Sequence, residues 1–271
     1  MPLVTTRALV LQTFPYSETS KILRLFTWDL GVRSVIAKGA LRPRSRFGGI
    51  LEPFTEGSAS LYVKEGRELH TLSGFDLLRS RQALGRSLSA FAGASLMAEL
   101  AIRTGTEDPH PALYQELAGG WDAIAAAEGE AATEAAAITG AWRVVSLIGL
   151  EPQTDACVVC GREVGTDEPV RFDAEAGGVA CTRCRPVGRL IDPASRAELR
   201  RMLRALALRG PFARPGLHRG LLRAFLEAQI AQGKPFRSLE LFLSAGEDAA
   251  EGRGSVDAAT GSRVDDPPPS A

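Results

Sequence analysis

No apolar stretch in this sequence approaches the roughly twenty residues that a helix needs to cross a membrane. The first residues also lack the charged segment, apolar segment and cleavage site of a secretory signal. We therefore expect a cytoplasmic protein, in which cysteines stay reduced. Hydrophobic residues make up 45% and charged residues 24% of the 271 residues, a composition typical of a globular protein with one large or two modest domains.

The patterns of common catalytic sites are also missing. There is no G-x-x-x-x-G-K-[ST] segment, which excludes a P-loop, and no serine lies in a nucleophile elbow. The three histidines, His70, His110 and His218, do not form the H-x-E pattern of the zinc deaminases. We therefore expect that the protein is not an enzyme.

Cysteine is scarce, but its placement is informative. The four cysteines of the chain form two C-x2-C pairs, Cys157 with Cys160 and Cys181 with Cys184. Each pair places two thiolates on one tight turn, and two pairs complete the tetrahedral shell of a structural Zn2+ ion. A closed shell leaves no position for a water ligand, so we expect this metal to fold the region and not to catalyse. Two disulfides or a redox C-x-x-C pair are the alternatives.

The apolar pattern divides the chain into strands and then helices. Residues 3 to about 78 alternate with period two between turn signals, and five short strands predict a small barrel of the OB type. An SH3-like barrel or a plain meander would give the same pattern. Beyond Phe75 the period becomes about 3.6, which predicts helices. We expect them near residues 88–102, 111–124, 130–148, 193–208 and 215–232, with 238–244 ending the ordered part.

The predicted fold class is therefore α+β. An N-terminal OB-fold β-barrel is expected over residues 1–79, followed by an all-α helical domain over 80–245 with a four-cysteine zinc-finger insertion at 153–190. Residues 246–271 lack an apolar period, and we expect a disordered acidic tail there. The tail has six acidic residues against Arg253 and Arg263, so the net charge of zero hides a mildly basic remainder.

A basic segment between two predicted barrel strands is the first candidate binding surface. No acidic residue lies between Leu30 and Leu51. Flexible barrel loops of this kind hold nucleic-acid strands through phosphate contacts. A solvated loop without a nucleic-acid partner is the alternative. We expect Phe47 to stack a base, and the residues expected to contact phosphates are Arg33, Lys38, Arg42, Arg44 and Arg46.

A second basic region follows the cysteines. Arg196, Arg200 and Arg204 recur at every fourth position of a predicted helix, which would place them in one basic stripe. Leucines and a methionine would form the opposite, apolar face of that helix. An ordinary exposed helix face is the alternative. We expect the stripe to be a second DNA-binding surface.

The order of short motifs along the chain carries a family resemblance. These motifs include Tyr16-Ser17-Glu18-Thr19-Ser20-Lys21-Ile22, Ala37-Lys38-Gly39-Ala40, Ser45-Arg46-Phe47-Gly48-Gly49 and Leu147-Ile148-Gly149-Leu150-Glu151-Pro152. Over roughly residues 3–244 the sequence resembles the RecO family of bacterial DNA repair and recombination mediators. Some members of that family lack the cysteines, so the zinc prediction depends on the residues of this chain.

The resemblance implies a function in DNA repair by homologous recombination. Such proteins bind single- and double-stranded DNA, anneal complementary strands, and act with RecR and sometimes RecF to load RecA onto gaps coated with single-stranded-DNA-binding protein (SSB). It further implies that the helical domain receives the acidic-hydrophobic tail of SSB, and that the protein is associated with the nucleoid. A zinc-stabilised protein–protein adaptor without direct DNA binding and a zinc-dependent enzyme acting on nucleic acid are the alternative classes.

Overall fold

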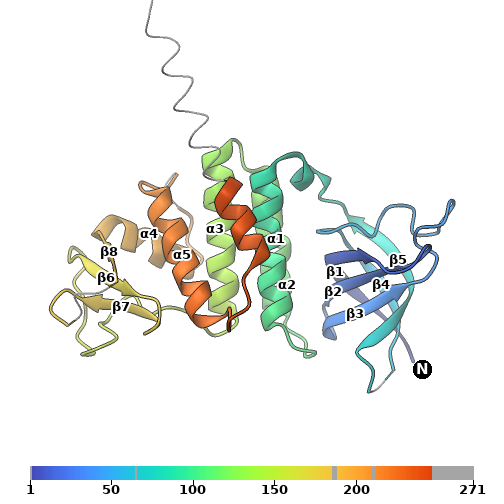
Figure 1. Cartoon of the computed structure of the whole chain (residues 1–271), viewed down its shortest axis with the longest axis horizontal. Coiled ribbons are helices and arrows are strands. Elements are labelled where there is room, and N and C mark those ends of the chain that lie inside the picture. The colour runs from blue at the N-terminus through green and yellow to red at the C-terminus, as the bar shows by residue number, and fades with distance from the viewer. Residues whose placement is uncertain (1, 65, 185–187, 209–210, 246–271) are drawn as a thin grey trace, which may run out of the picture.

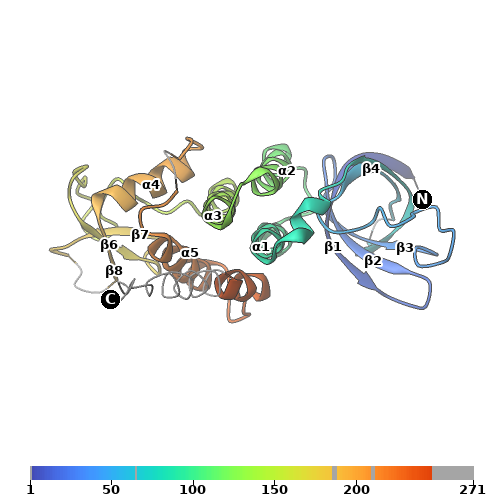
Figure 2. The same ribbon diagram turned by 90° about the horizontal axis from the view of Figure 1, so that it is seen from above.

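The computed structural model describes residues 2–64, 66–184, 188–208 and 211–245. A β-barrel forms one end of an elongated molecule, helices form the middle, and a small sheet with the cysteines forms the other end (Figures 1 and 2). The tail predicted over residues 246–271 lies outside the described residues. Among the described residues, no helix combines the length and the apolarity that crossing a bilayer demands.

Five strands close into a barrel in the order β1-β2-β3-β5-β4. Neighbouring strands are antiparallel except for β3 and β5, which run parallel. Alternate residues point inward, as a period of two requires, so Val10, Leu25 and Val35 share the barrel core. The strands are β1 (Leu3–Pro15), β2 (Lys21–Thr27), β3 (Gly31–Ala37), β4 (Glu56–Tyr62) and β5 (Leu69–Arg79).

Three helices pack side by side next to the barrel: α1 (Leu88–Thr104), α2 (Pro111–Ala126) and α3 (Glu130–Leu147) (Figure 2). A short 3-10 helix, η1 (Gln82–Arg86), leads from β5 into them. Glycine lets α1 and α3 approach closely, because a Cβ atom on Gly93 would lie only 2.5 Å from Cβ of Ala137. This close packing explains why α3 is rich in alanine.

Two further helices and a three-stranded sheet complete the far end. The helices are α4 (Pro193–Leu203) and α5 (Pro215–Gln229), and residues 237–245 are also helical. The sheet has the order β7-β6-β8, with β6 (Val170–Asp173), β7 (Gly178–Cys181) and β8 (Arg189–Ile191). The sequence predicted α4 to reach residue 208, but it ends at Leu203, and Ala205 has a left-handed φ of 57°.

The rings of Trp142 on α3, Phe172 on β6 and Phe225 on α5 join the small sheet to the helices. Their ring centroids are 5.2 to 6.4 Å apart. The side-chain amide of Gln229 adds a hydrogen bond to the carbonyl oxygen of Ala174 at 2.7 Å. Because these contacts are buried and aromatic, they fix the cysteine-bearing sheet against the helical core.

Polar contacts join the barrel to the helices. The Val32 amide of β3 donates a hydrogen bond to the carbonyl oxygen of Thr106, which lies in the loop before α2. The distance is 2.8 Å. Close by, Gly31 has a φ of 64°, and a Cβ atom there would lie 2.4 Å from backbone oxygens of this loop. Glu56 of β4 forms a second junction, where Arg7, Arg81 and the Tyr114 hydroxyl all donate to its carboxylate.

Candidate metal centre and basic loop

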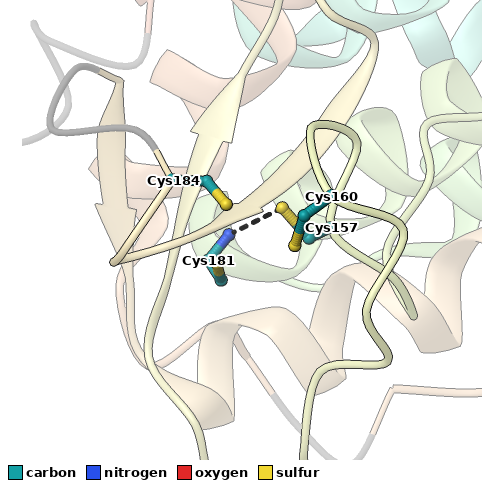
Figure 3. Close-up of side chains that lie close together, drawn as sticks. All are labelled: Cys157, Cys160, Cys181 and Cys184. Carbon is teal, nitrogen blue, oxygen red and sulfur yellow. Dashed lines mark hydrogen bonds between the residues drawn. The ribbon is translucent and has the colours of Figure 1, made fainter.

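The four cysteines come together from two separate turns (Figure 3). Cys157 and Cys160 lie on a turn in which the Gly161 amide donates to the Cys157 carbonyl oxygen at 2.8 Å. Cys181 ends β7 and Cys184 follows in the next turn. All four sulfur atoms lie within 4.8 Å of one another, and none of them forms a disulfide. The disulfide alternative is therefore not what the structure contains.

This spacing fits one tetrahedral metal ion. Sulfur atoms at the usual zinc distance of about 2.3 Å from a common centre are about 3.8 Å apart. Cys157 and Cys181 are buried, Cys184 is half-buried and Cys160 is exposed, so the cluster lies at the edge of the fold. The backbone amide of Cys181 also donates to the Cys157 sulfur at 3.3 Å, the kind of contact that supports a thiolate.

The thiols of Cys181 and Cys184 lie in contact. Hydrogen bonding with Cys184 lowers the pKa of Cys181 to about 6. The same contact raises the pKa of Cys184 to about 12. The contact thus favours the thiolate of Cys181 and the protonated thiol of Cys184, and a cation bound at the centre would favour the thiolates of both. The cysteines therefore form a candidate metal centre with four sulfur ligands.

The segment that joins β3 to β4 extends from the barrel with four exposed cations, Lys38, Arg42, Arg44 and Arg46. We call residues 38–46 the basic loop. None of these four cations forms an ion pair with another described residue. Their charges therefore face solvent, as a surface that binds phosphates requires.

One predicted contact on this side is wrong, and a second residue has a partner within the protein. Phe47 was expected to stack a base, but its side chain is only 2% exposed and belongs to the barrel core. Arg46 instead lies over the Phe47 ring, 4.9 Å from its centroid. Arg33 was expected beside the loop, but its Nη1 atom pairs with Oε2 of Glu107 at 2.6 Å, and its side chain is 11% exposed. Arg33 thus joins the barrel to the helices.

The predicted basic stripe on α4 is also wrong. Arg196 is 1% exposed, and its guanidinium donates to the carbonyl oxygen of Gly165. Arg200 and Arg204 both pair with Asp155, each at 2.7 Å. Arg196 is therefore buried, and Arg200 and Arg204 share one carboxylate, which offsets one of their two positive charges. All three residues connect α4 to the cysteine-bearing region.

Exposed aromatic residues near the basic loop were missed. Phe14 and Tyr16 lie at the end of β1 with exposed fractions of 45% and 60%. A β-bulge between Val10 and Gln12 shifts the register of β1 against β2, which reverses the alternation for the residues beyond it. The sequence does show two aromatic residues close to the end of a strand, and this could have pointed to the exposed pair. The sequence gives no sign of the bulge itself.

Comparison with known proteins decides the family. The family model for the N-terminal part of recombination protein O matches residues 1–81, and the model for the C-terminal part matches residues 85–240. The chain belongs to the RecO family. The DNA repair protein RecO of Anaeromyxobacter sp. (strain K) is 36% identical over 241 residues, which cover 86% of this chain and 93% of that protein.

Relatives from other lineages match over most of this chain or over about two thirds of it. The DNA repair protein RecO of Rubrobacter xylanophilus is 34% identical over 247 residues, or 88% of this chain and 96% of that protein. The RecO of Bifidobacterium adolescentis is 31% identical over 186 residues, or 67% of this chain and 73% of that protein. The two RecO family models meet close to the end of β5, so the barrel and the helical part correspond to separate models.

Proposed function

We propose that this RecO-family protein acts in DNA repair by binding single-stranded DNA through the basic loop of its barrel. The observation that carries the proposal is a set of four exposed cations on one loop without a paired carboxylate among the described residues. The barrel itself, with five strands in the order β1-β2-β3-β5-β4, fits the OB fold, whose loops commonly hold nucleic-acid strands. Phosphate contacts of this kind are independent of base sequence.

The proposed mechanism is charge neutralisation without a chemical step, so we propose that the protein is not an enzyme. Two DNA strands repel each other through their phosphates, and a strand neutralised on the basic loop approaches its complement more readily. Strand annealing and the loading of RecA with RecR, and with RecF where it takes part, belong to this proposal through family membership. Helix α4 is left out of this proposal, because Arg196 is buried and Arg200 and Arg204 pair with Asp155.

We propose that the four cysteines hold a structural zinc ion. Cys157, Cys160, Cys181 and Cys184 would supply all four ligands, so the ion would have no open position for a substrate. Its role would be to tie the turn at Cys157 to the end of β7. The aromatic contacts with α3 and α5 would then transmit this order to the helices.

The helical part offers a groove for the proposed partner SSB. It has a volume of about 790 Å3 and lies between α2, α3, residues 205–208 and Pro211. Small side chains such as Ala132 and Ala136 line it, together with Glu128 and with Arg143, which pairs with Glu116 at 2.5 Å. The apolar lining fits the hydrophobic residues of a peptide that is both acidic and hydrophobic, and Arg143 would have to leave Glu116 to pair with its acidic residues.

The test of DNA binding is reversal of the loop charges. In the variant with Arg42, Arg44 and Arg46 each changed to Glu, we expect weaker binding of single-stranded DNA and a flatter dependence on salt. Each lost phosphate contact should lower the slope of log K against log salt by about 0.7, so three contacts give about 2. Fluorescence anisotropy of a labelled oligonucleotide across a salt series measures both quantities.

A matched control changes the same total charge elsewhere. Arg86, Arg223 and Arg237 are exposed and lie in the helical part, far along the chain from the basic loop. Their reversal to Glu should leave the salt slope near the parent value. Equal slopes for the loop variant and the parent would exclude the loop. A parent protein that has no affinity for DNA at low salt, yet binds a recombination partner, would favour the adaptor function instead.

A further inference from the structure

Two large aromatic side chains are exposed at the end of β1, where burial would stabilise them. Phe14 and Tyr16 are 45% and 60% exposed. Within the part of the chain that the structure describes, neither ring lies against another aromatic ring. Single exposed apolar side chains are common on protein surfaces, so the meaning of these two depends on what surrounds them.

The barrel register places Phe14 on the outer surface. It is paired with Ile22 of β2, which is in turn paired with Ile36 of β3. Ile22 and Ile36 are only partly buried. Their chain neighbours Leu23 and Val35, whose side chains point into the barrel, are fully buried. The row Phe14–Ile22–Ile36 is therefore an apolar strip on the outer face of β1, β2 and β3.

A cation lies in the neighbouring row of the same face. Arg24 of β2 is exposed, is paired with Ser34 of β3 in the ladder, and donates to the Ser34 hydroxyl at 2.7 Å. The outer face of these strands thus combines flat apolar surface with positive charge. This is the face through which OB-type barrels bind oligonucleotides.

The basic loop lies against the same end of the barrel. The Leu41 amide of the loop donates to the carbonyl oxygen of Thr19 in the turn between β1 and β2, at 2.9 Å. That turn is closed by the Tyr16 amide, which donates to the Ser20 carbonyl oxygen at 2.9 Å. Tyr16 and the cations of the loop therefore belong to connected turns at one edge of the barrel.

We propose that Phe14 and Tyr16 form a stacking platform for the bases of a single strand whose phosphates the basic loop holds. This inference rests on the proposed function, since the loop must bind the strand for the bases to reach the rings. A polyanion with exposed flat rings satisfies both halves of the surface. An apolar protein partner would leave four cations without counter-charges, and a duplex keeps its bases stacked inside.

The platform predicts an effect that is separate from charge. Removal of an aromatic ring that stacks a base weakens single-strand binding by about 5- to 150-fold. The number of phosphate contacts does not change, so the salt slope should remain at the parent value. Loss of affinity with an unchanged slope is the opposite of what loop reversal should give.

The experiment compares a thymine oligonucleotide with an abasic oligonucleotide of equal length. The parent should bind the thymine strand more tightly than the abasic strand. The variant F14A/Y16A should bind both strands equally, with the parent salt slope, whereas F14Y/Y16F should retain the preference because its rings still stack. F14L/Y16L keeps apolar side chains without aromatic rings and should behave like F14A/Y16A. Thermal unfolding of each variant checks that the barrel remains folded.

The control and the contrary outcomes separate the two proposals. F91A removes an aromatic side chain on α1 that is 38% exposed, and it should leave the preference for thymine unchanged. If F14A/Y16A retains the parent preference for the thymine strand, the platform is wrong while DNA binding stands. If the parent binds neither strand at low salt, both proposals fail.

Discussion

At the scale of single residues, Cys160 offers a test of how much the far end depends on the proposed metal ion. It is the exposed member of the cluster, so its side chain contributes little to packing. Val164, Val170 and Val179 near it belong to the same apolar core as the helices. The turns that carry the cysteines have no disulfide among the described residues, so a bound metal ion would be what ties these turns together.

The variant Cys160→Ser should therefore lose zinc and unfold at a lower temperature. We expect the metal content to fall from about one ion per chain to a small fraction of that, because a hydroxyl replaces a thiolate in a four-ligand shell. Metal analysis and thermal unfolding of the same sample measure the two effects. Thr182→Ser, an exposed change between two ligands, is the control. Full retention of metal by Cys160→Ser would show that the cluster does not bind zinc through this residue.

Arginine was the residue type whose role the sequence predicted least well. Arg196 shares a helix face with Leu199 and Leu203, so its long side chain lies in the interior and reaches the Gly165 carbonyl oxygen. A spacing of four residues predicts that side chains lie in one row along a helix. It does not predict whether that row faces water or the protein interior. The cysteines were predictable because ligand spacing is itself a geometric constraint.

At the scale of elements, the five strands and most helices could be predicted from apolar period and turn residues. The bulge in β1 could not, because one extra residue leaves the local pattern intact and only the pairing with β2 reveals it. The end of α4 at Leu203 was equally hidden, since the sequence beyond it remains apolar and basic. In both cases tertiary contacts overrode a local preference, and in β1 the result is the exposed ring of Phe14.

The junction of β4 with the helices leads to a prediction about pH. Burial favours the neutral form of Glu56, but hydrogen bonds from Arg7, Arg81 and Tyr114 outweigh it and lower the pKa of this carboxyl below its usual 4.5. A folded-state pKa below the unfolded value stabilises the protein above about pH 4.5, and this stabilisation is lost as the pH falls through the folded-state value. Glu56 therefore joins the two parts of the molecule at neutral pH.

The variant Glu56→Gln should lower the free energy of unfolding by about 2 kcal/mol at neutral pH, because Arg7 loses its counter-charge and the buried Arg81 keeps only Asp122. The difference from the parent should shrink in acid, below about pH 4.5. Urea unfolding at neutral and at acid pH measures it. Glu52→Gln breaks an exposed pair with Lys21 and should cost less than about 1 kcal/mol. An equal difference at both pH values would mean that the charge of Glu56 is not what stabilises the junction.

At the scale of the whole molecule, the barrel and the cysteine-bearing sheet lie at opposite ends, with the helices between them (Figure 1). The proposed DNA surface lies at the barrel end, where the four cations of the basic loop are exposed without ion pairs among the described residues. The sequence predicted a cationic barrel rim beside a helical body held by a metal. In the structure, the barrel with its basic loop and the candidate metal centre lie at opposite ends (Figure 1).

Net charge then affects how a strand approaches this end. Residues 1–245 contain 30 basic and 26 acidic residues, a net charge of +4, whereas the whole chain is neutral. Removal of residues 246–271 should therefore raise the affinity for single-stranded DNA at low salt, by roughly three- to tenfold. The gain should fade above about 0.1 M salt, where the screening length is about 10 Å. Anisotropy titrations at both salt concentrations measure it.

A full-length variant separates the charge of residues 246–271 from their bulk. It has amides in place of the six carboxylates of that segment and keeps its length. If charge is the cause, this variant should bind DNA as tightly as the truncated protein at low salt, because both lack the same negative charges. If it binds like the parent while the truncated protein binds more tightly, the segment hinders DNA by occupying space. Because steric exclusion is not screened by ions, that hindrance would also persist at high salt.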